Sequence, residues 1–172
     1  PLVEGIDTRQ LILKVRNFGS IMGRLDTKPV KPQMAELPRD MVTTVSCKQV
    51  ETYGEGGVTI GLLDYGVKEN IIRSFTDRGC RVLRFPNLTK AEDVLAAGVD
   101  GILLSNGPGD PAVLDFEVGE IRKLLGKKPL LGVCLGNQLL GRACGASTLK
   151  LAFGHRGVNQ PVLETATGRG LL

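Results

Sequence analysis

The chain has no tryptophan, a single histidine and no long hydrophobic run anywhere in its 172 residues. A membrane helix needs roughly 18 or more consecutive apolar residues, and no stretch of this sequence approaches that length. No segment has the charge and small-residue pattern of a signal peptide. We therefore expect a cytoplasmic protein without a membrane partner, whose length fits one domain or one domain plus part of another.

Metal-ligating residues are also scarce. The four cysteines form no C-x-x-C pair, and one histidine is too few to complete a usual zinc site with them. We therefore expect neither a metal nor a cofactor in this chain. Three of the cysteines, Cys47, Cys80 and Cys144, are predicted to be free thiols without a function.

A concentrated basic surface is missing, although the net charge is +4. Residues 51–172 hold 14 Lys and Arg against 13 Asp and Glu, and the basic residues are dispersed. A nearly neutral body without a basic stripe interleaved with aromatic residues is a poor surface for DNA or RNA. We therefore expect no nucleic-acid partner.

The composition changes near residue 50. Residues 26–40 are polar and carry three prolines, which predicts a connection between domains. The segment before it, residues 5–19, has the pattern of one amphipathic helix, and a single helix cannot bury a core of its own. We therefore interpret residues 1–50 as the end of a separate amino-terminal domain with its linker, and residues 58–172 as a second domain.

Short apolar segments alternate with segments of helical periodicity from residue 58 onward. The alternation predicts an α/β domain with a parallel, doubly wound sheet that is covered by helices on both faces. In such sheets ligands bind beyond the carboxyl ends of the strands, which directs attention to loops 106–111 and 134–137. The expected strands cover residues 58–64, 80–85, 101–105, 129–134 and 148–151, and the expected helices lie around residues 67–75, 91–98, 118–125 and 137–144.

The sharpest motif is G-V-C-L-G-N-Q at residues 132–138, which places Cys134 between an expected strand and an expected helix. It is the cysteine counterpart of the G-x-S-x-G nucleophile turn. Glycines flank the cysteine because the turn is tight and a Cβ atom there would clash. The positive end of the following helix favours a thiolate, and the first N–H groups of that helix can face an oxyanion. The motif predicts a nucleophile, although a buried structural cysteine would also fit it.

The second motif is S-N-G-P-G-D-P at residues 105–111, a stiff loop that contains two glycines and two prolines. A phosphate-binding loop is one interpretation, but the prolines remove two donors and no G-K-[ST] follows. An ordinary turn is another interpretation. We favour a rigid wall beside Cys134 that presents backbone N–H groups to a polar substrate.

These two motifs resemble those of the class I, triad-type glutamine amidotransferases, whose domain has a flavodoxin-like sheet. Three further segments resemble one branch of that class, the small chain or fused amidotransferase region of carbamoyl-phosphate synthetase. They are G-I-D-T-R at residues 5–9, D-Y-G-V-K-E-N-I at 64–71 and F-G-H-R-G-V-N-Q-P-V at 153–162. The likeness runs in the same order along nearly the whole chain.

The resemblance implies that Cys134 attacks the side-chain carboxamide of glutamine, forming a thioester and releasing ammonia. It implies that backbone N–H groups of Leu135 and Gly107 hold the oxyanion, and that glutamine is bound by Gly107, Gly109, Leu135 and Gln138. The implied partner is the synthetase large chain or a fused synthetase domain. That partner would hold ATP and Mg²⁺ and make carbamoyl phosphate from bicarbonate, for pyrimidine or arginine synthesis.

Two features depart from the pattern of this family. The family has its catalytic histidine and glutamate in an H-P-E segment far downstream of the cysteine, and no such segment occurs up to Leu172. His155 matches a different segment, so we interpret it as a structural loop residue rather than as the catalytic base. Asn137 stands where many relatives have histidine. We therefore expect the chain to be an internal piece of a longer protein and to be inactive by itself.

Two other functions fit parts of the sequence. A scaffold or regulatory module would keep the fold without making ammonia, which agrees with the missing H-P-E segment and with Asn137. Another class I amidotransferase, of the anthranilate or GMP branch, would share the two motifs at residues 105–111 and 132–138. The segments at 5–9 and 153–162 argue against that second alternative.

Overall fold

The computed structural model describes residues 4–19, 23, 40–152, 154 and 159–172. The chain divides into two compact units, residues 36–148 and residues 1–35 together with 149–172. None of the helices in the described part of the chain is long and apolar enough to cross a membrane. The larger unit carries both predicted motifs.

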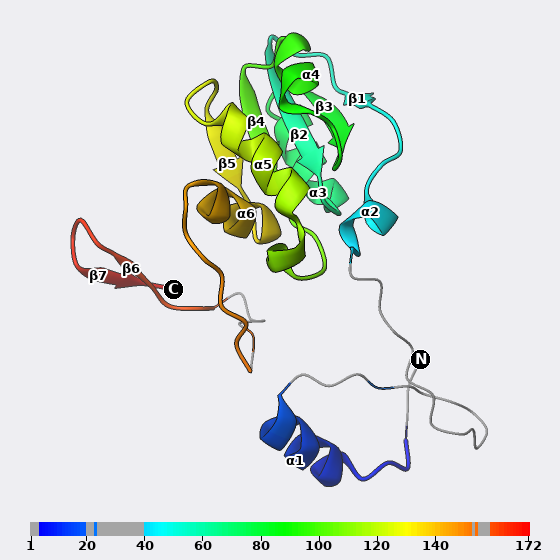
Figure 1. Ribbon diagram of the computed structural model, residues 1–172, viewed down its shortest axis with the longest axis vertical. Coiled ribbons are helices and arrows are strands. Elements are labelled where there is room, and N and C mark those ends of the chain that lie inside the picture. The colour runs from blue at the N-terminus through cyan, green and yellow to red at the C-terminus, as the bar shows by residue number, and fades with distance from the viewer. Residues whose placement is uncertain (1–3, 20–22, 24–39, 153, 155–158) are drawn as a thin grey trace. The chain divides into compact units, whose positions relative to one another are not determined.

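A five-stranded sheet forms the frame of the larger unit (Figure 1). Its strand order is β1-β3-β2-β4-β5, with β1 antiparallel at one edge and the other four strands parallel. The predicted parallel α/β sheet is therefore confirmed. The strands are β1 (Glu51–Tyr53), β2 (Val58–Asp64), β3 (Cys80–Pro86), β4 (Gly101–Leu104) and β5 (Leu130–Gly132).

Helices cover both faces of this sheet. Successive side chains of a strand point to opposite faces, so the apolar runs of the central strands serve two cores. Leu63 and Leu104 pack in the cluster that includes α4, α5 and α6, whereas Leu62 and Leu103 pack with Ile72 of α3. The helices of this unit are α2 (Val42–Val45), α3 (Glu69–Thr76), α4 (Ala91–Ala96), α5 (Asp115–Leu124) and α6 (Leu135–Ala143), with a short 3-10 turn η1 (Pro111–Val113).

The chain order creates a switch point in the middle of the sheet. From β2 the chain crosses to β3 on one side, and from β3 it returns to β4 on the other side of β2. The loops that leave the carboxyl ends of the neighbouring strands β2 and β4 therefore run in opposite directions. Open α/β sheets bind their ligands at such a point. Loop 106–111 leaves β4, and the turn that contains Cys134 leaves β5 next to it.

Most expected elements of the larger unit are present. The strands predicted at 58–64, 80–85 and 101–105 are confirmed within one residue at each end. The strand predicted at 129–134 is shorter and ends at Gly132, because the backbone turns at Cys134 and helix α6 begins directly after it. The sequence analysis missed β1 and α2, which have three and four residues.

The smaller unit contains the expected helix, α1 (Thr8–Phe18). The side chain of Asp7 caps it by accepting the N–H of Gln10 at 2.9 Å, and Gly19 ends it with φ 76°. An unpredicted antiparallel hairpin of β6 (Val162–Glu164) and β7 (Arg169–Leu171) also belongs to this unit.

The strand predicted at 148–151 is wrong. These residues have no regular secondary structure, and Leu149 is 84% exposed. The alternation in this short segment resembles a strand, but no neighbouring strand pairs with it among the described residues, and an isolated extended segment gains no ladder hydrogen bonds. The connection predicted at 26–40 lies, apart from residue 40, outside the described residues.

Candidate active site

Cys134 occupies a strained turn between β5 and α6. Its backbone has φ 54° and ψ −110°, and it is the only non-glycine residue with positive φ in the described part of the chain. Such a conformation costs on the order of 1–3 kcal/mol and is found mainly at functional sites. The side chain is exposed at the carboxyl edge of the sheet. The predicted strand-to-helix turn at Cys134 is therefore confirmed.

The two glycines of the G-x-C-x-G motif are required by close backbone contacts. A Cβ atom on Gly132 would lie 2.5 Å from the backbone nitrogen of Asn137. A Cβ atom on Gly136 would lie 2.1 Å from the carbonyl oxygen of Leu104. Real Cβ atoms do not approach backbone atoms this closely, so only glycine fits at either position. The helix that follows Cys134 is thereby pressed against the end of β4.

Loop 106–111 lies against the start of the same helix. A Cβ atom on Gly107 would meet the carbonyl oxygen of Tyr65 at 2.1 Å and the Cδ2 atom of Leu135 at 2.9 Å. Gly109 has φ 98°, a conformation that favours glycine. The sequence prediction that this loop stands beside the cysteine turn is thus supported by the packing of Gly107 on Leu135.

The backbone N–H groups around the Cys134 turn differ in whether they already have an acceptor. The N–H of Gly136 is used, because it donates to the carbonyl oxygens of Ser105 and Val133, both at 3.0 Å. The N–H groups of Leu135 and Gly107 donate to no acceptor within the residues that the structure describes. Donors of this kind, held by a rigid frame, can stabilise an oxyanion. The role assigned to these two N–H groups stays a prediction.

Gln138 and Asn137 are both exposed in the first turn of α6. The N–H of Gln138 donates to the carbonyl oxygen of Cys134 at 3.1 Å, which places Gln138 one helical turn beyond the cysteine. The glutamine-binding role of Gln138 is untested by this geometry. His155 lies outside the described residues.

The far end of loop 106–111 is fastened to α6 by Arg142. Its guanidinium donates from Nη1 to the carbonyl oxygen of Pro111, and its Nη2 lies 2.8 Å from the Oδ1 atom of Asp115. Asp115 is 83% exposed, so this ion pair contributes little free energy of its own. The contact matters for geometry, because it joins the end of the loop to the helix that starts at Cys134.

Asp64 anchors the turn after β2, a role that the sequence pattern did not indicate. Its fully buried carboxylate accepts the N–H groups of Gly66 and Val67 at 2.9 Å and that of Cys47 at 2.8 Å, and its Oδ2 lies 2.7 Å from Nη2 of Arg84. Burial alone would raise the pKa of Asp64, but the three N–H groups and the guanidinium outweigh burial and hold the pKa below its ordinary value of 3.8.

This lowered pKa gives a pH-dependent stability. Since the folded-state pKa is below the unfolded-state value, the carboxylate stabilises the fold fully above about pH 4 and loses its contribution as the pH falls further. We expect Asp64→Asn to lower the free energy of unfolding by about 2 kcal/mol at neutral pH, because a charged hydrogen-bond partner of Arg84 is lost. Urea unfolding followed by circular dichroism between about pH 3 and pH 7 measures the difference. A difference that does not shrink below about pH 4 would contradict the assignment.

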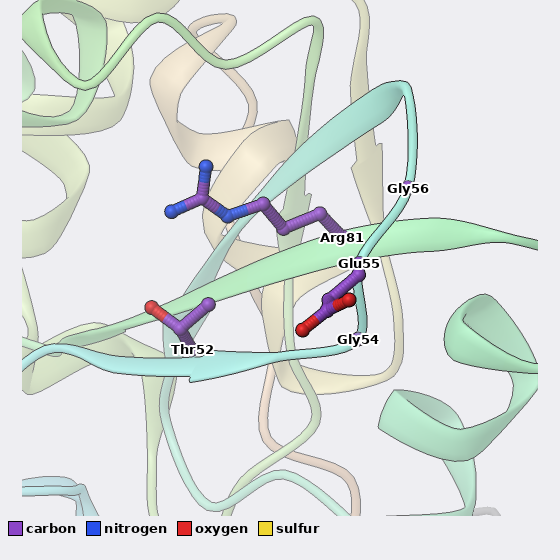
Figure 2. A pocket seen from close by; sticks show the side chains of 5 residues that line it. All are labelled: Thr52, Gly54, Glu55, Gly56 and Arg81. Carbon is purple, nitrogen blue, oxygen red and sulfur yellow. The ribbon is translucent and has the colours of Figure 1, made fainter.

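A surface pocket lies elsewhere on the larger unit. Figure 2 shows the residues that line it, among them the charged side chains of Arg81 and Glu55. Arg81 is near the amino end of β3, so the pocket opens at the end of the sheet opposite to Cys134. The pocket is lined by Thr52, Gly54, Glu55, Gly56 and Arg81.

No group of three or more His, Cys, Asp or Glu side chains in the described ranges could hold a metal ion. The expectation that the chain binds no cofactor stays a prediction.

The fold and the site define an α/β protein with an exposed cysteine on a strained strand-to-helix turn, at the carboxyl edge of a parallel sheet. The sequence pattern of the family described as "Glutamine amidotransferase class-I" matches residues 61–171. The chain belongs to this family. The match runs from within β2 to the end of β7 and includes both motifs.

The curated proteins that are similar to this chain include small chains of carbamoyl phosphate synthase. The chain is 43% identical to the carbamoyl phosphate synthase small chain of Staphylococcus epidermidis, over 98% of this chain and 48% of that protein. It is 45% identical to the pyrimidine-specific small chain of Halalkalibacterium halodurans, over 98% and 48%, and 43% identical to the arginine-specific small chain of Geobacillus stearothermophilus, over 95% and 46%. The chain thus spans about half the length of the curated relatives that it matches.

Proposed function

We propose that this chain is the glutamine-hydrolysing part of a carbamoyl-phosphate synthase. The observation that carries the proposal is the strained turn at Cys134, whose exposed thiol directly precedes Leu135, the residue against which Gly107 of loop 106–111 packs. Membership in the class I glutamine amidotransferases supports cysteine chemistry on glutamine. The names of the relatives support the synthase.

The reaction starts when the Cys134 sulfur, as thiolate, attacks the carboxamide carbon of glutamine. The N–H groups of Leu135 and Gly107 hold the negative charge that develops on the carboxamide oxygen. The C–N bond then breaks, and the nitrogen leaves as ammonia after gaining a proton. Water hydrolyses the resulting γ-glutamyl thioester, which releases glutamate and restores the thiol. Gly109 and Gln138 bind the glutamine during these steps.

The ammonia passes to the partner, a synthetase large chain or a fused synthetase domain. That partner combines it with bicarbonate and ATP, and needs Mg²⁺, so this chain requires no cofactor of its own. The expected compartment is the cytoplasm, where ATP and glutamine are available. Relatives named for pyrimidine synthesis and for arginine synthesis are about equally similar, so both pathways fit.

Isotope transfer tests this function. The protein at its full natural length, together with its synthetase, is incubated with glutamine labelled with ¹⁵N in the amide, bicarbonate, ATP and Mg²⁺. We expect the label in carbamoyl phosphate. Label found only in free ammonia would indicate a glutaminase that serves another synthetase. Release of no label at all would support a scaffold and reject the proposal.

The chain of 172 residues, taken by itself, is expected to turn glutamine over very slowly. The leaving nitrogen must be protonated before ammonia departs, and the thioester must be attacked by an activated water. General acid–base assistance to such steps raises the rate by about 10²–10⁴-fold. The single histidine of the chain, His155, matches a segment of the family that does not supply the base. Ammonia release by the purified chain, with Cys134→Ala as background, measures the activity. Rapid turnover that depends on Cys134 would contradict this expectation and would point to His155 as the base.

A further inference from the structure

The peptide bond between Asn106 and Gly107, which carries the N–H of Gly107, is held by the side chains of Ser105 and Asn106. Its carbonyl oxygen, which belongs to Asn106, accepts the hydroxyl of Ser105 at 2.9 Å. The same hydroxyl oxygen accepts the N–H of Tyr65 at 2.8 Å, and Ser105 is fully buried. The plane of this peptide bond is therefore fixed from the side opposite to its N–H.

The carboxamide of Asn106 forms a bridge to the turn after β2. Its Nδ2 donates to the carbonyl oxygen of Gly66 at 2.9 Å, and its Oδ1 accepts the N–H of Lys68 at 3.3 Å. Both atoms of the carboxamide are therefore used, one as donor and one as acceptor. The bridge joins loop 106–111 to a segment that lies 40 residues earlier in the chain.

The turn that receives this bridge is rigid. The buried carboxylate of Asp64 binds the N–H groups of Gly66 and Val67. Gly66 has φ 120°, and a Cβ atom on it would lie 3.1 Å from Cδ of Pro108 and 3.4 Å from Cα of Gly107. The loop thus rests on a turn that cannot move without breaking hydrogen bonds to a buried charge.

We infer that Ser105 and Asn106 are positioning residues that set the direction of the Gly107 N–H. Neither side chain is assigned to bind glutamine, and both act through the peptide bond that they hold. A donor that stabilises an oxyanion must already point at the oxygen before the reaction, because reorientation during the reaction would cost part of its benefit. The inference rests on the proposed function, since it assigns a use to Gly107 in that reaction.

Asn106→Ala removes both bridge hydrogen bonds from a half-buried position, where the fold can tolerate the change. We expect kcat for glutamine hydrolysis to fall by about 10–100-fold, because misplacement of a catalytic donor by about 1 Å costs up to that factor. We expect KM for glutamine to stay within about threefold, because the donor acts on the transition state more than on bound glutamine. Synthesis from added ammonia should be unchanged.

Asn106→Asp and Asn70→Ala complete the set of variants. Aspartate has the shape of asparagine and keeps the acceptor for Lys68, but it replaces the donor to Gly66 by an oxygen, so we expect kcat to fall here as well. Asn70 is an exposed asparagine of α3 whose carboxamide contacts Arg73, and its alanine variant should keep the wild-type kcat. The assays use the protein at its full natural length with its synthetase.

A second measurement does not depend on turnover. In ¹⁵N relaxation of the chain, we expect Asn106→Ala to lower the heteronuclear NOE of the Gly107 amide, while Asn70→Ala leaves it unchanged. If the wild type hydrolyses glutamine but both Asn106 variants keep kcat within about twofold, the inference is wrong and the proposed function stands. A raised KM at unchanged kcat would also overturn it. If the wild type does not hydrolyse glutamine, the proposed function fails, and an unchanged NOE would then reject the positioning role too.

Discussion

Cys134→Ser is expected to abolish glutamine-dependent synthesis of carbamoyl phosphate and to leave synthesis from added ammonia within about twofold of wild type. Serine keeps the size and the backbone turn of Cys134, but its hydroxyl is a far weaker nucleophile without a base that is matched to it. Loss of the nucleophile should lower glutamine hydrolysis by at least about 10³-fold. In the proposed reaction added ammonia would bypass this step, because it would reach the synthetase without forming the thioester.

Both activities are measured on the same preparation, with glutamine and then with ammonium chloride as nitrogen source. Cys144→Ser is a matched control, because Cys144 is also an exposed free cysteine and directly follows helix α6 at its other end. We expect that control to match the wild type with both nitrogen sources. Equal loss of the two activities in Cys134→Ser would show that Cys134 is structural. Glutamine-dependent synthesis at the wild-type rate in this variant would show that Cys134 is not the nucleophile.

The central strands could be predicted because each is a short, mostly apolar segment with a clear end. β3 stops at Pro86, and β2 ends at Asp64 before a turn with Gly66. β1 could not be predicted in this way, because Glu51–Tyr53 is short and half polar, and it is a strand only through its antiparallel pairing with β3. Such pairing joins residues about 30 apart, which local periodicity does not reveal.

The position of Cys134 could also be predicted, because glycines on both sides of a cysteine between a strand and a helix indicate a tight turn. The hydrogen bonds and ion pairs that hold the neighbouring loops in place could not be predicted. Arg84 sits in a strand pattern where a charged residue suggests a solvent-facing position, yet the register of β3 against β2 places it beside the buried Asp64. The bridge from Asn106 to Gly66 likewise depends on the switch of strand order between β2 and β4. Partners of this kind are set by the assembled sheet.

Gly136→Ala is expected to have the largest effect on stability among the changes considered. A Cβ atom at this position would lie 2.1 Å from the carbonyl oxygen of Leu104, 2.5 Å from its carbonyl carbon and 2.7 Å from its Cβ atom. The obstacle is the backbone of a central strand, which cannot rotate away as a flexible side chain could. Helix α6 must therefore move away from the sheet. The turn at Cys134 would move with it, because the helix begins directly after this residue.

We expect this shift to cost about 3 kcal/mol of unfolding free energy, at the upper end of what an added methyl group in a packed core costs. Gly141→Ala is the matched control in the same helix, because its Cβ atom would lie 4.0 Å from the Cβ atom of Ala146, an ordinary van der Waals distance. Alanine is the better helix former, so the control should gain about 0.5–1 kcal/mol. Urea unfolding of both variants, followed by circular dichroism, measures the two changes against wild type. Equal stability of the two variants would mean that α6 does not pack on β4 at Gly136, and the close placement of Cys134 beside loop 106–111 would lose its support.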